Sequence, residues 1–238
     1  MPKRFFLIFA LCLCCVPSGF SFDVKMTEAV YERRVAGEGV FQFDFSLAEL
    51  KGAPKASIEL VKKLIYSGKT IQEYIAYKEK LFIGTGGGAN GFSKAGGYTS
   101  NYSETTDILF LSGAYILVKY TEEFYRAPAA HGMTQTLYYI IDTVEKRLLG
   151  IDDIIETVPE AALQKAVGQK YNLDLSYRRT LWPPDTISFS TKGLVLFWNV
   201  YSIAPYVFGP TEIVLPFSVV EPYLTAKGQS LQKAFGIR

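Results

Sequence analysis

The chain has 238 residues, with 25 basic and 23 acidic side chains and a formal net charge of +2. Hydrophobic residues make up 49% and aromatic residues 15%, which is enough for one large core or two small ones. Charges of both signs are mixed along the chain, so the basic face that nucleic-acid binding needs is not expected. After the first residues no apolar run is long enough to predict a membrane span.

The N-terminus has the pattern of a secretory signal peptide. Lys3 and Arg4 form a basic start, and an apolar run of 12 residues follows at Phe5–Val16. Small residues come next, with Gly19 and Ser21 at the expected cleavage site. A helix of that length spans about 18 Å, which is short of the roughly 30 Å of bilayer hydrocarbon. We therefore expect an exported protein in a periplasmic or extracellular location; a buried first strand or helix is the alternative.

All cysteines of the chain, Cys12, Cys14 and Cys15, lie in this apolar run. The mature chain would then contain no thiol nucleophile, no thiolate zinc site and no disulfide. Lipidation of Cys15, or less readily of Cys14, is an alternative that would anchor the protein to the envelope.

Strands and two helices are expected in the first half of the chain. Alternating bulky and polar residues predict strands from Asp23 to Phe45. A helix is predicted after Pro54, with an interruption at Gly68. Thr70 and Glu73 form a T-x-x-E capping box, which predicts a second helix with an apolar face made of Ile71, Tyr74, Ile75 and Leu81.

Residues 84–106 are rich in Gly, Ser, Thr and Asn, and we interpret them as a long mobile loop between two modules. Gly86, Gly88 and Gly91 match G-x-G-x-x-G within this stretch. Nucleotide binding through that motif needs a helix directly after the glycines, and the following residues are polar and non-periodic. A flexible loop is therefore favoured, and no cofactor is expected.

The second half is predicted to contain more strands than helices. Strands are expected at Ile108–Tyr120, with a break at Ser112-Gly113, and at Thr136–Asp142. Thr157 and Glu160 form a second capping box before a helix with Leu163, Val167 and Tyr171 on one face. A rigid turn at Trp182–Asp185 precedes three further strands, at residues 186–190, 194–200 and 213–217.

Many strands, few helices and no regular β-α-β alternation predict an α+β fold with mostly antiparallel sheet. The predicted organisation is a signal peptide at residues 1–21, modules at 22–107 and 108–228, and a tail at 229–238.

His131 is the only histidine. Without histidine or cysteine partners a stable zinc site is not expected, and no nucleophile motif such as G-x-S-x-G is present. We favour a turn residue whose ring bonds to the backbone; a catalytic base and a ligand contact are the alternatives.

Adjacent acids occur at Asp152-Asp153 and Glu122-Glu123. Neighbours in sequence point apart on a strand or helix, so neither pair is expected to form a catalytic dyad. We interpret Asp152 and Asp153 as the cap of a short helical turn.

The segment from Gly193 to Phe217 is the most informative part of the chain. Two predicted strands flank a connection that contains prolines and aromatic residues. Aromatic side chains on a proline-stiffened loop lose little entropy when they bind. The candidate ligand-binding residues are therefore Tyr201, Pro205, Tyr206 and Phe208, with His131 as a further candidate. The alternative is that these rings cover the end of the sheet.

This segment and the residues before it resemble the domain that closes the extracytoplasmic part of RsiV-type, lysozyme-sensing anti-sigma factors and also accompanies PdaC-type peptidoglycan deacetylases. The matching residues are His131-Gly132, Tyr139 to Asp142, Gly150 to Ile154, and Tyr201-Ser202-Ile203-Ala204-Pro205-Tyr206 with Gly209-Pro210. The likeness covers about residues 108–225, and residues 23–107 more loosely resemble the companion N-terminal module.

The resemblance implies an envelope location and binding of peptidoglycan or of a protein such as a lysozyme. Ala129 and Ala130 replace the usual glycines. Little more than Lys3 and Arg4 precedes the apolar run, so no anti-sigma segment is expected. A single histidine cannot build the histidine-rich metal site of the deacetylases. We therefore expect a non-enzymatic binding or sensing protein without a metal; a hydrolase of envelope glycans or peptides using His131 or carboxylates is the alternative.

Overall fold

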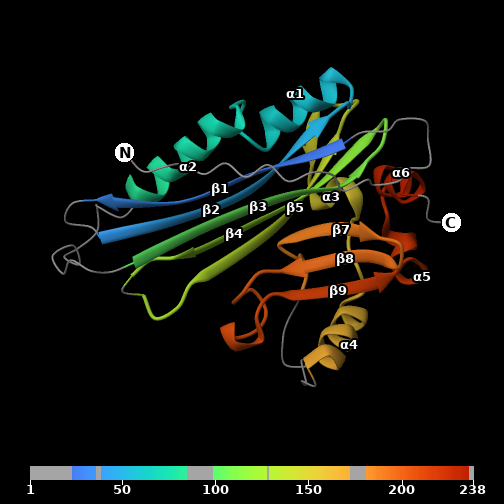
Figure 1. Ribbon diagram of the computed structural model, residues 1–238. Coiled ribbons are helices and arrows are strands. Elements are labelled where there is room, and N and C mark those ends of the chain that lie inside the picture. Colours follow the sequence, from blue (N-terminus) through green and yellow to red (C-terminus); the bar gives the residue numbers. More distant parts are fainter. Residues whose placement is uncertain (1–22, 36–38, 85–98, 128, 172–180, 236–238) are drawn as a thin grey trace. The chain divides into compact units, whose positions relative to one another are not determined.

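The computed structural model describes residues 23–35, 39–84, 99–127, 129–171 and 181–235. The predicted signal peptide, its cysteines and the glycines of the G-x-G-x-x-G match lie outside the described residues. The described strands form two sheets, with the orders β1-β2-β3-β4-β5-β6 and β7-β8-β9 (Figure 1). Helices accompany both sheets, so the predicted α+β class is confirmed.

Two compact units make up the chain. Unit 1 consists of Met1–Phe110 and Val118–Thr136, and unit 2 consists of Leu111–Leu117 and Leu137–Arg238. The expected module boundary at residues 107–108 falls inside a strand, and both β4 and β5 contribute residues to the two units.

Unit 1 begins with a long antiparallel hairpin of β1 (Asp23–Val35) and β2 (Gly39–Lys51), in which Asp23 lies opposite Lys51. The predicted alternation along β2 is confirmed, because the inward positions Phe41, Phe43, Phe45 and Leu47 are buried. These rings and the aliphatic side chain form the centre of the core of unit 1.

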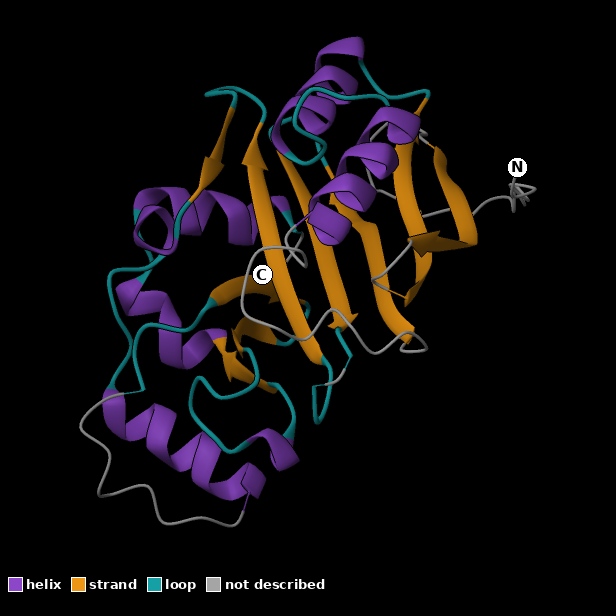
Figure 2. Cartoon of the chain, turned by 90° about the vertical axis from the view of Figure 1, so that its left-hand side faces the viewer, coloured by secondary structure: helices purple, strands orange, loops and turns teal. Residues whose placement is uncertain are grey.

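Two helices pack against β2 on one side of the sheet, α1 (Lys55–Leu64) and α2 (Ile71–Gly84) (Figures 1 and 2). Gly68 lies between them with a positive φ of 74°. The predicted capping box is confirmed: Oε2 of Glu73 accepts the N–H of Thr70 at 2.8 Å, and Oγ1 of Thr70 accepts the N–H of Glu73 at 3.3 Å.

The inward face of α2 differs in one position from the prediction. Ile71, Tyr74 and Ile75 are buried, but Leu81 is 46% exposed and Phe82 is buried in its place. Phe82 follows Ile75 by two helical turns, so it returns to the same face of the helix, whereas Leu81 is rotated away from it.

The prediction of a loop at residues 84–106 is wrong for its last part, because Thr99–Leu111 form β3. This strand runs parallel to β2, with Val40 opposite Thr99 and Ser46 opposite Thr105. Its buried positions are largely polar, namely Ser100, Tyr102, Glu104 and Thr106. A strand that buries hydrogen-bonding side chains does not show the apolar alternation by which a strand is predicted.

β4 (Tyr115–Tyr125) follows β3 after the predicted break at Ser112 and Gly113. β5 (Met133–Asp142) covers the predicted strand, and a hairpin connects it to β6 (Arg147–Leu149). Leu148 lies opposite Ile141 in that hairpin.

Unit 2 contains an antiparallel sheet of β7 (Thr186–Ser190), β8 (Gly193–Trp198) and β9 (Thr211–Pro216), which confirms the three predicted strands. Trp198 at the end of β8 is buried, and its indole N–H donates to the carbonyl oxygen of Leu181 at 3.1 Å. The 3₁₀ turn η1 (Tyr206–Phe208) lies between β8 and β9.

The helices of unit 2 are α3 (Ile151–Ile154), α4 (Glu160–Tyr171), α5 (Phe217–Val220) and α6 (Ala226–Ala234), with the 3₁₀ turn η2 (Glu221–Tyr223) after α5. Leu163 and Val167 are buried on α4 as predicted, and the carboxylate of Glu160 accepts the N–H of Leu181 at 2.8 Å. The expected tail at residues 229–238 is helical through Ala234, and its Leu231 is fully buried.

A chain of charges ties the β5–β6 hairpin of unit 2 to two helices. Lys227 on α6 donates to Asp142 and to Glu145, both at 2.6 Å. Arg147 pairs with Glu145 at 2.8 Å and with Asp153 of α3 at 2.7 Å. Asp153 also accepts the N–H of Gly150 at 2.7 Å, so the interpretation of this acid as a helix cap is confirmed.

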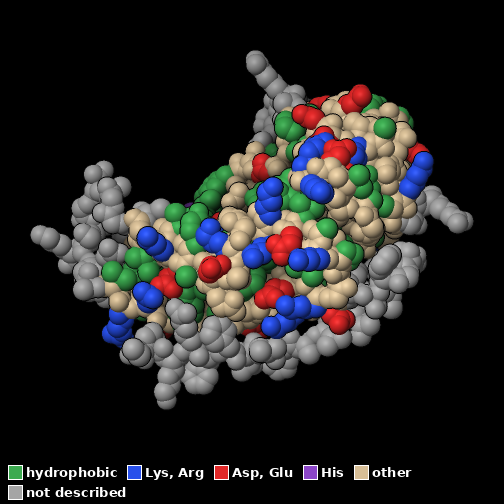
Figure 3. Space-filling model, turned by 90° about the horizontal axis from the view of Figure 1, so that it is seen from above, with side chains coloured by type: hydrophobic (Ala, Val, Ile, Leu, Met, Phe, Trp, Pro, Cys, Tyr) green, Lys and Arg blue, Asp and Glu red, His purple; other side chains and the backbone are tan. Residues whose placement is uncertain are grey.

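The described residues contain no helix that is both long and apolar enough to cross a membrane. On the face that carries α1 and α2, acidic and basic side chains are interspersed and neither sign dominates (Figure 3).

Candidate functional site

The connection between β8 and β9 carries the aromatic residues that the sequence singled out. We call Tyr201–Pro210 the aromatic segment. Tyr201 is 55% exposed and Phe208 41%, while Tyr206 is half-buried. Ile203 and Ala204 are buried and fix the segment to the unit. The structure therefore presents two of the three predicted rings to solvent rather than placing all of them over the sheet end.

The start of the aromatic segment is held by a carboxylate from the turn before β7. Oδ2 of Asp185 accepts the N–H of Asn199 and the hydroxyl of Ser202, both at 2.6 Å. Tyr201 between them has a φ of +70°, which few non-glycine residues adopt unless their surroundings impose it. The backbone here is thus restrained by specific bonds.

The rest of the aromatic segment is ordered by its turn and by ring contacts. The carbonyl oxygen of Pro205 accepts the N–H of Phe208 at 3.0 Å. The Tyr201 and Tyr206 ring centroids lie 5.6 Å apart, and the Phe208 and Tyr171 centroids lie 5.2 Å apart in a T-shaped arrangement. Such pairs favour defined relative orientations of the aromatic side chains.

His131 is exposed and belongs to unit 1, whereas the aromatic segment belongs to unit 2. Its Nδ1 lies 2.9 Å from the carbonyl oxygen of Gly132. This contact agrees with the interpretation of a turn residue whose ring bonds to the backbone. No three histidine, cysteine or acidic side chains among the described residues are grouped so that they could hold a metal ion.

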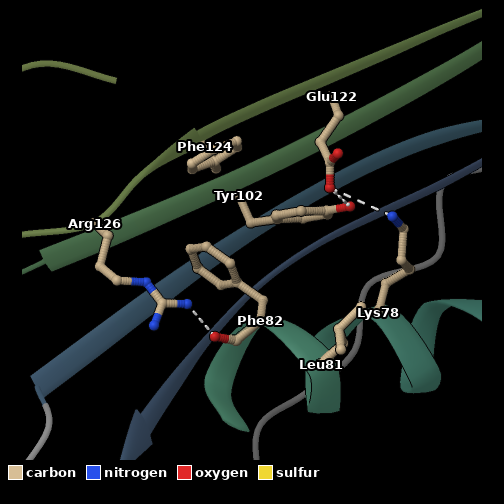
Figure 4. A pocket seen from close by; sticks show the side chains of 7 residues that line it. All are labelled: Lys78, Leu81, Phe82, Tyr102, Glu122, Phe124 and Arg126. Atoms are coloured by element: carbon tan, nitrogen blue, oxygen red, sulfur yellow. Dashed lines mark hydrogen bonds and ion pairs between the residues drawn. The ribbon is translucent and has the colours of Figure 1, made fainter. Parts of the chain in front are cut away.

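Unit 1 contains a pocket of about 430 Å³ that no pattern in the sequence predicts (Figure 4). Lys78, Leu81 and Phe82 of α2 line one wall, and Tyr102 of β3 lies opposite. Glu122 and Phe124 of β4, with Arg126 directly after it, complete the lining. In Figure 4 the rings of Phe82, Tyr102 and Phe124 lie between Arg126 on one side and the Glu122–Lys78 pair on the other.

A buried charge cluster adjoins this pocket and contributes Lys78, Tyr102 and Glu122 to its lining. Nζ of Lys78 lies 3.2 Å from Oε2 of Glu104, 3.3 Å from Oε1 of Glu122 and 3.0 Å from the hydroxyl of Tyr120. An ammonium group has three hydrogens, so these three acceptors occupy all of its donors. The side chain of Glu104 is fully buried, and its Oε1 has no hydrogen-bond partner among the described residues.

Tyr102 connects the two carboxylates of the cluster. Its hydroxyl lies 2.6 Å from Oε2 of Glu104 and 2.7 Å from Oε1 of Glu122. Burial, and then the nearby Glu104, raise the pKa of Tyr102 far above its ordinary value, so the hydroxyl keeps its proton at neutral pH. One proton can complete only one of the two short contacts at a time.

Known proteins resemble this chain in two respects, a family match within its second half and a similar fold over most of its length. Residues 151–218 match the family model of DUF3298, described as a protein of unknown function, and this range includes the aromatic segment. A search of curated proteins gave no match.

Two solved structures are similar over most of the chain. A member of the DUF3298 family from Bacteroides fragilis has a TM-score of 0.64 at 15% identity, covering 87% of this chain and 94% of that one. A DUF3298 family protein from Pseudomonas aeruginosa has a TM-score of 0.59 at 14% identity, covering 86% and 94%. At these identities the likeness shows a shared fold and carries no function.

Sequence reasoning missed the pocket cluster because its members are far apart along the chain and come from three elements. In the sequence Glu122 stands out only as the neighbour of Glu123, yet Glu123 is exposed while Glu122 faces Lys78. The period of two along Ser100, Tyr102, Glu104 and Thr106 exists only in their burial, because the residues between them are polar as well. No sequence signal therefore marked these residues as a strand.

Proposed function

We propose that this protein is exported to the cell envelope and acts there as a non-enzymatic binding or sensing protein. It binds peptidoglycan or a lysozyme-like protein through the aromatic segment. The observation that carries this proposal is the exposure of Tyr201 and Phe208 on a segment held in place by Asp185.

Restrained aromatic rings are suited to binding for two physical reasons. Large rings supply contact area at low entropic cost, and a tyrosine hydroxyl tolerates water when no partner is present. A restrained backbone means that less order must be imposed on binding. Val207 adds apolar surface, because it is 83% exposed beside Phe208.

The choice of partner rests on the resemblance of residues 108–225 to the RsiV-type domain, whose C-terminal motif coincides with the aromatic segment. The match of residues 151–218 to DUF3298 covers the same motif and supports a common domain, although the description of that family names no ligand.

Co-sedimentation with purified peptidoglycan and capture on immobilised lysozyme test the binding. We expect one of the two to retain the protein, and we expect Tyr201→Ala and Phe208→Ala to weaken that retention. Tyr77→Ala is the matched control, because Tyr77 is 42% exposed and belongs to unit 1. Retention on neither material, or retention that both variants leave unchanged, contradicts the proposal.

Export and the absence of catalysis need separate tests. N-terminal sequencing of the cellular protein should find a start near Phe22 or Asp23; an intact Met1 would contradict export, and an acylated Cys15 would make the protein a lipoprotein. Incubation with envelope glycans and peptides should give no products. Turnover that disappears in His131→Ala would favour the hydrolase instead.

A further inference from the structure

We propose that the pocket of unit 1 binds a small ligand that carries a primary ammonium group on an aromatic or aliphatic body, with the ammonium placed at Glu122. This site is independent of the aromatic segment, since its lining residues all belong to unit 1.

The first argument is a surplus of hydrogen-bond acceptors at the Glu122 end of the pocket. The three donors of Lys78 are already directed at Glu104, Glu122 and the Tyr120 hydroxyl, and the Tyr102 proton is shared by two carboxylates. Glu104 does not line the pocket, so its Oε1, which has no hydrogen-bond partner among the described residues, is not open to a ligand. Glu122 does line it, and the contacts from Lys78 and Tyr102 both go to its Oε1, which leaves Oε2 as the acceptor for a ligand. At the Glu122 end of the pocket a ligand therefore meets an acceptor whose neighbouring protons are already used, so it must bring a donor.

The second argument is charge. Two carboxylates face one ammonium group in the cluster, so a buried negative charge remains uncompensated when both acids are ionised. Such a charge is costly in a low-dielectric interior, and a cation from the ligand removes that cost. Glu122 is the accessible member, because 20% of its side chain is exposed whereas Glu104 is fully buried.

The walls select the body of the ligand and its orientation. Phe82, Tyr102 and Phe124 present ring surface, and a volume of about 430 Å³ is in the range of pockets for small molecules. At the opposite end the Arg126 guanidinium donates to the carbonyl oxygen of Phe82 and stacks 4.6 Å from its ring. Its positive charge repels an ammonium group, so the cation points toward Glu122 and the apolar body lies between the rings.

Calorimetric titration with three ligands of similar shape tests this assignment. The probes are phenethylammonium, 2-phenylethanol and 3-phenylpropionate, which differ in charge. We expect phenethylammonium to bind at least about tenfold more tightly than the alcohol, as hydrogen bonds to a charged group would give. The carboxylate should bind most weakly. Equal binding of the amine and the alcohol, or no binding of the amine at millimolar concentrations, overturns the proposal.

Glu122→Gln and Glu123→Gln form a matched pair of variants, since they change neighbouring residues by the same loss of charge and Glu123 is exposed. Glu122→Gln should abolish the preference for the amine, and Glu123→Gln should keep it. Phe124→Ala should weaken the binding of the amine and of the alcohol by the same factor. This result would distinguish the contribution of the aromatic wall from that of the Glu122 charge. A preference that survives in a folded Glu122→Gln protein, as judged by its thermal melt, places the ammonium elsewhere and refutes the assignment.

Discussion

The ammonium group of Lys78 lies 3.2 Å from Oε2 of Glu104, a carboxylate whose side chain is entirely shielded from solvent. A second carboxylate, Glu122, lies 3.3 Å from the same nitrogen. Three ionisable side chains, from Lys78, Glu104 and Glu122, therefore lie together between α2, β3 and β4 of unit 1. Removal of the lysine or of a carboxylate should destabilise the fold, because the remaining charge would then be buried without its partner.

Replacement of this lysine by methionine should strongly destabilise the protein. Lys78→Met keeps most of the side-chain volume but leaves Glu104 buried without its cation, which costs about 3–5 kcal/mol in comparable sites. Urea denaturation measures the change in the free energy of unfolding. Lys80→Met is the control, because Lys80 is exposed on the same helix and its loss should change stability by less than about 0.5 kcal/mol. Similar losses for the two variants would contradict a role for the buried pair.

Addition of a single methyl group at Gly228 should also destabilise the protein. A Cβ atom there would lie 2.1 Å from the backbone oxygen of Ile154, so α6 would have to move away from α3. Overpacking of this kind costs about 1–3 kcal/mol. Gly113→Ala should be nearly neutral, since nothing lies within 4 Å of the added atom. Equal melting temperatures for the Gly228→Ala variant and the parent protein would show that the two helices are not closely packed.

Strands with apolar inward side chains could be predicted from the sequence, and strands with polar inward side chains could not. β2 was predicted because Phe41, Phe43 and Phe45 alternate with polar residues, and burial of the rings follows directly from that pattern. β3 was missed because Tyr102 and Glu104 occupy the equivalent inward positions. Polar residues at inward positions are indistinguishable from loop residues until their partners on other elements are known.

The same distinction applies to the two sites. The aromatic segment is one continuous stretch, so a motif could identify it, and the structure adds the restraint by Asp185 and the exposure of the rings. The pocket cluster joins Lys78, Glu104 and Glu122 through tertiary contacts alone. No spacing in one sequence encodes such a contact.

Acid should remove one electrostatic contribution to the stability of unit 2. The hydrogen bond from Arg147 lowers the pKa of Asp153 from 3.8 to about 2, aided by the Gly150 N–H, while partial burial opposes the shift. A carboxyl whose folded-state pKa is lowered stabilises the fold above its ordinary pKa and loses that effect as the pH falls toward the folded-state value. The melting temperature of the parent protein should therefore approach that of Asp153→Asn between pH 3.8 and about 2.

Asp152→Asn is the control for the acid prediction. Asp152 is exposed, and of the two adjacent aspartates it is Asp153 that pairs with Arg147. Its melting temperature should follow that of the parent protein at every pH. The difference between the parent protein and Asp153→Asn should also shrink at high salt, since solvent ions screen a partly exposed pair. A difference that is constant from pH 7 to pH 2 would exclude the ion pair as its cause.

The restraint of the aromatic segment can be tested without removing any aromatic ring. Asp185→Ala deletes the acceptor of the Asn199 N–H and of the Ser202 hydroxyl, while Tyr201, Tyr206 and Phe208 remain. Asp185 is exposed, so water replaces the lost acceptor and the free energy of unfolding should fall by no more than about 1–1.5 kcal/mol. If a fixed backbone contributes to binding, the aromatic segment of this variant must be ordered when its partner binds. Retention on peptidoglycan or lysozyme should then weaken roughly tenfold, which corresponds to the entropy of ordering one or two side chains. Asp185→Asn keeps one side-chain oxygen and should lie between the parent protein and Asp185→Ala in both measurements. Unchanged binding by a destabilised Asp185→Ala protein would mean that the rings act without the restraint, and that preorganisation of the segment contributes nothing to recognition.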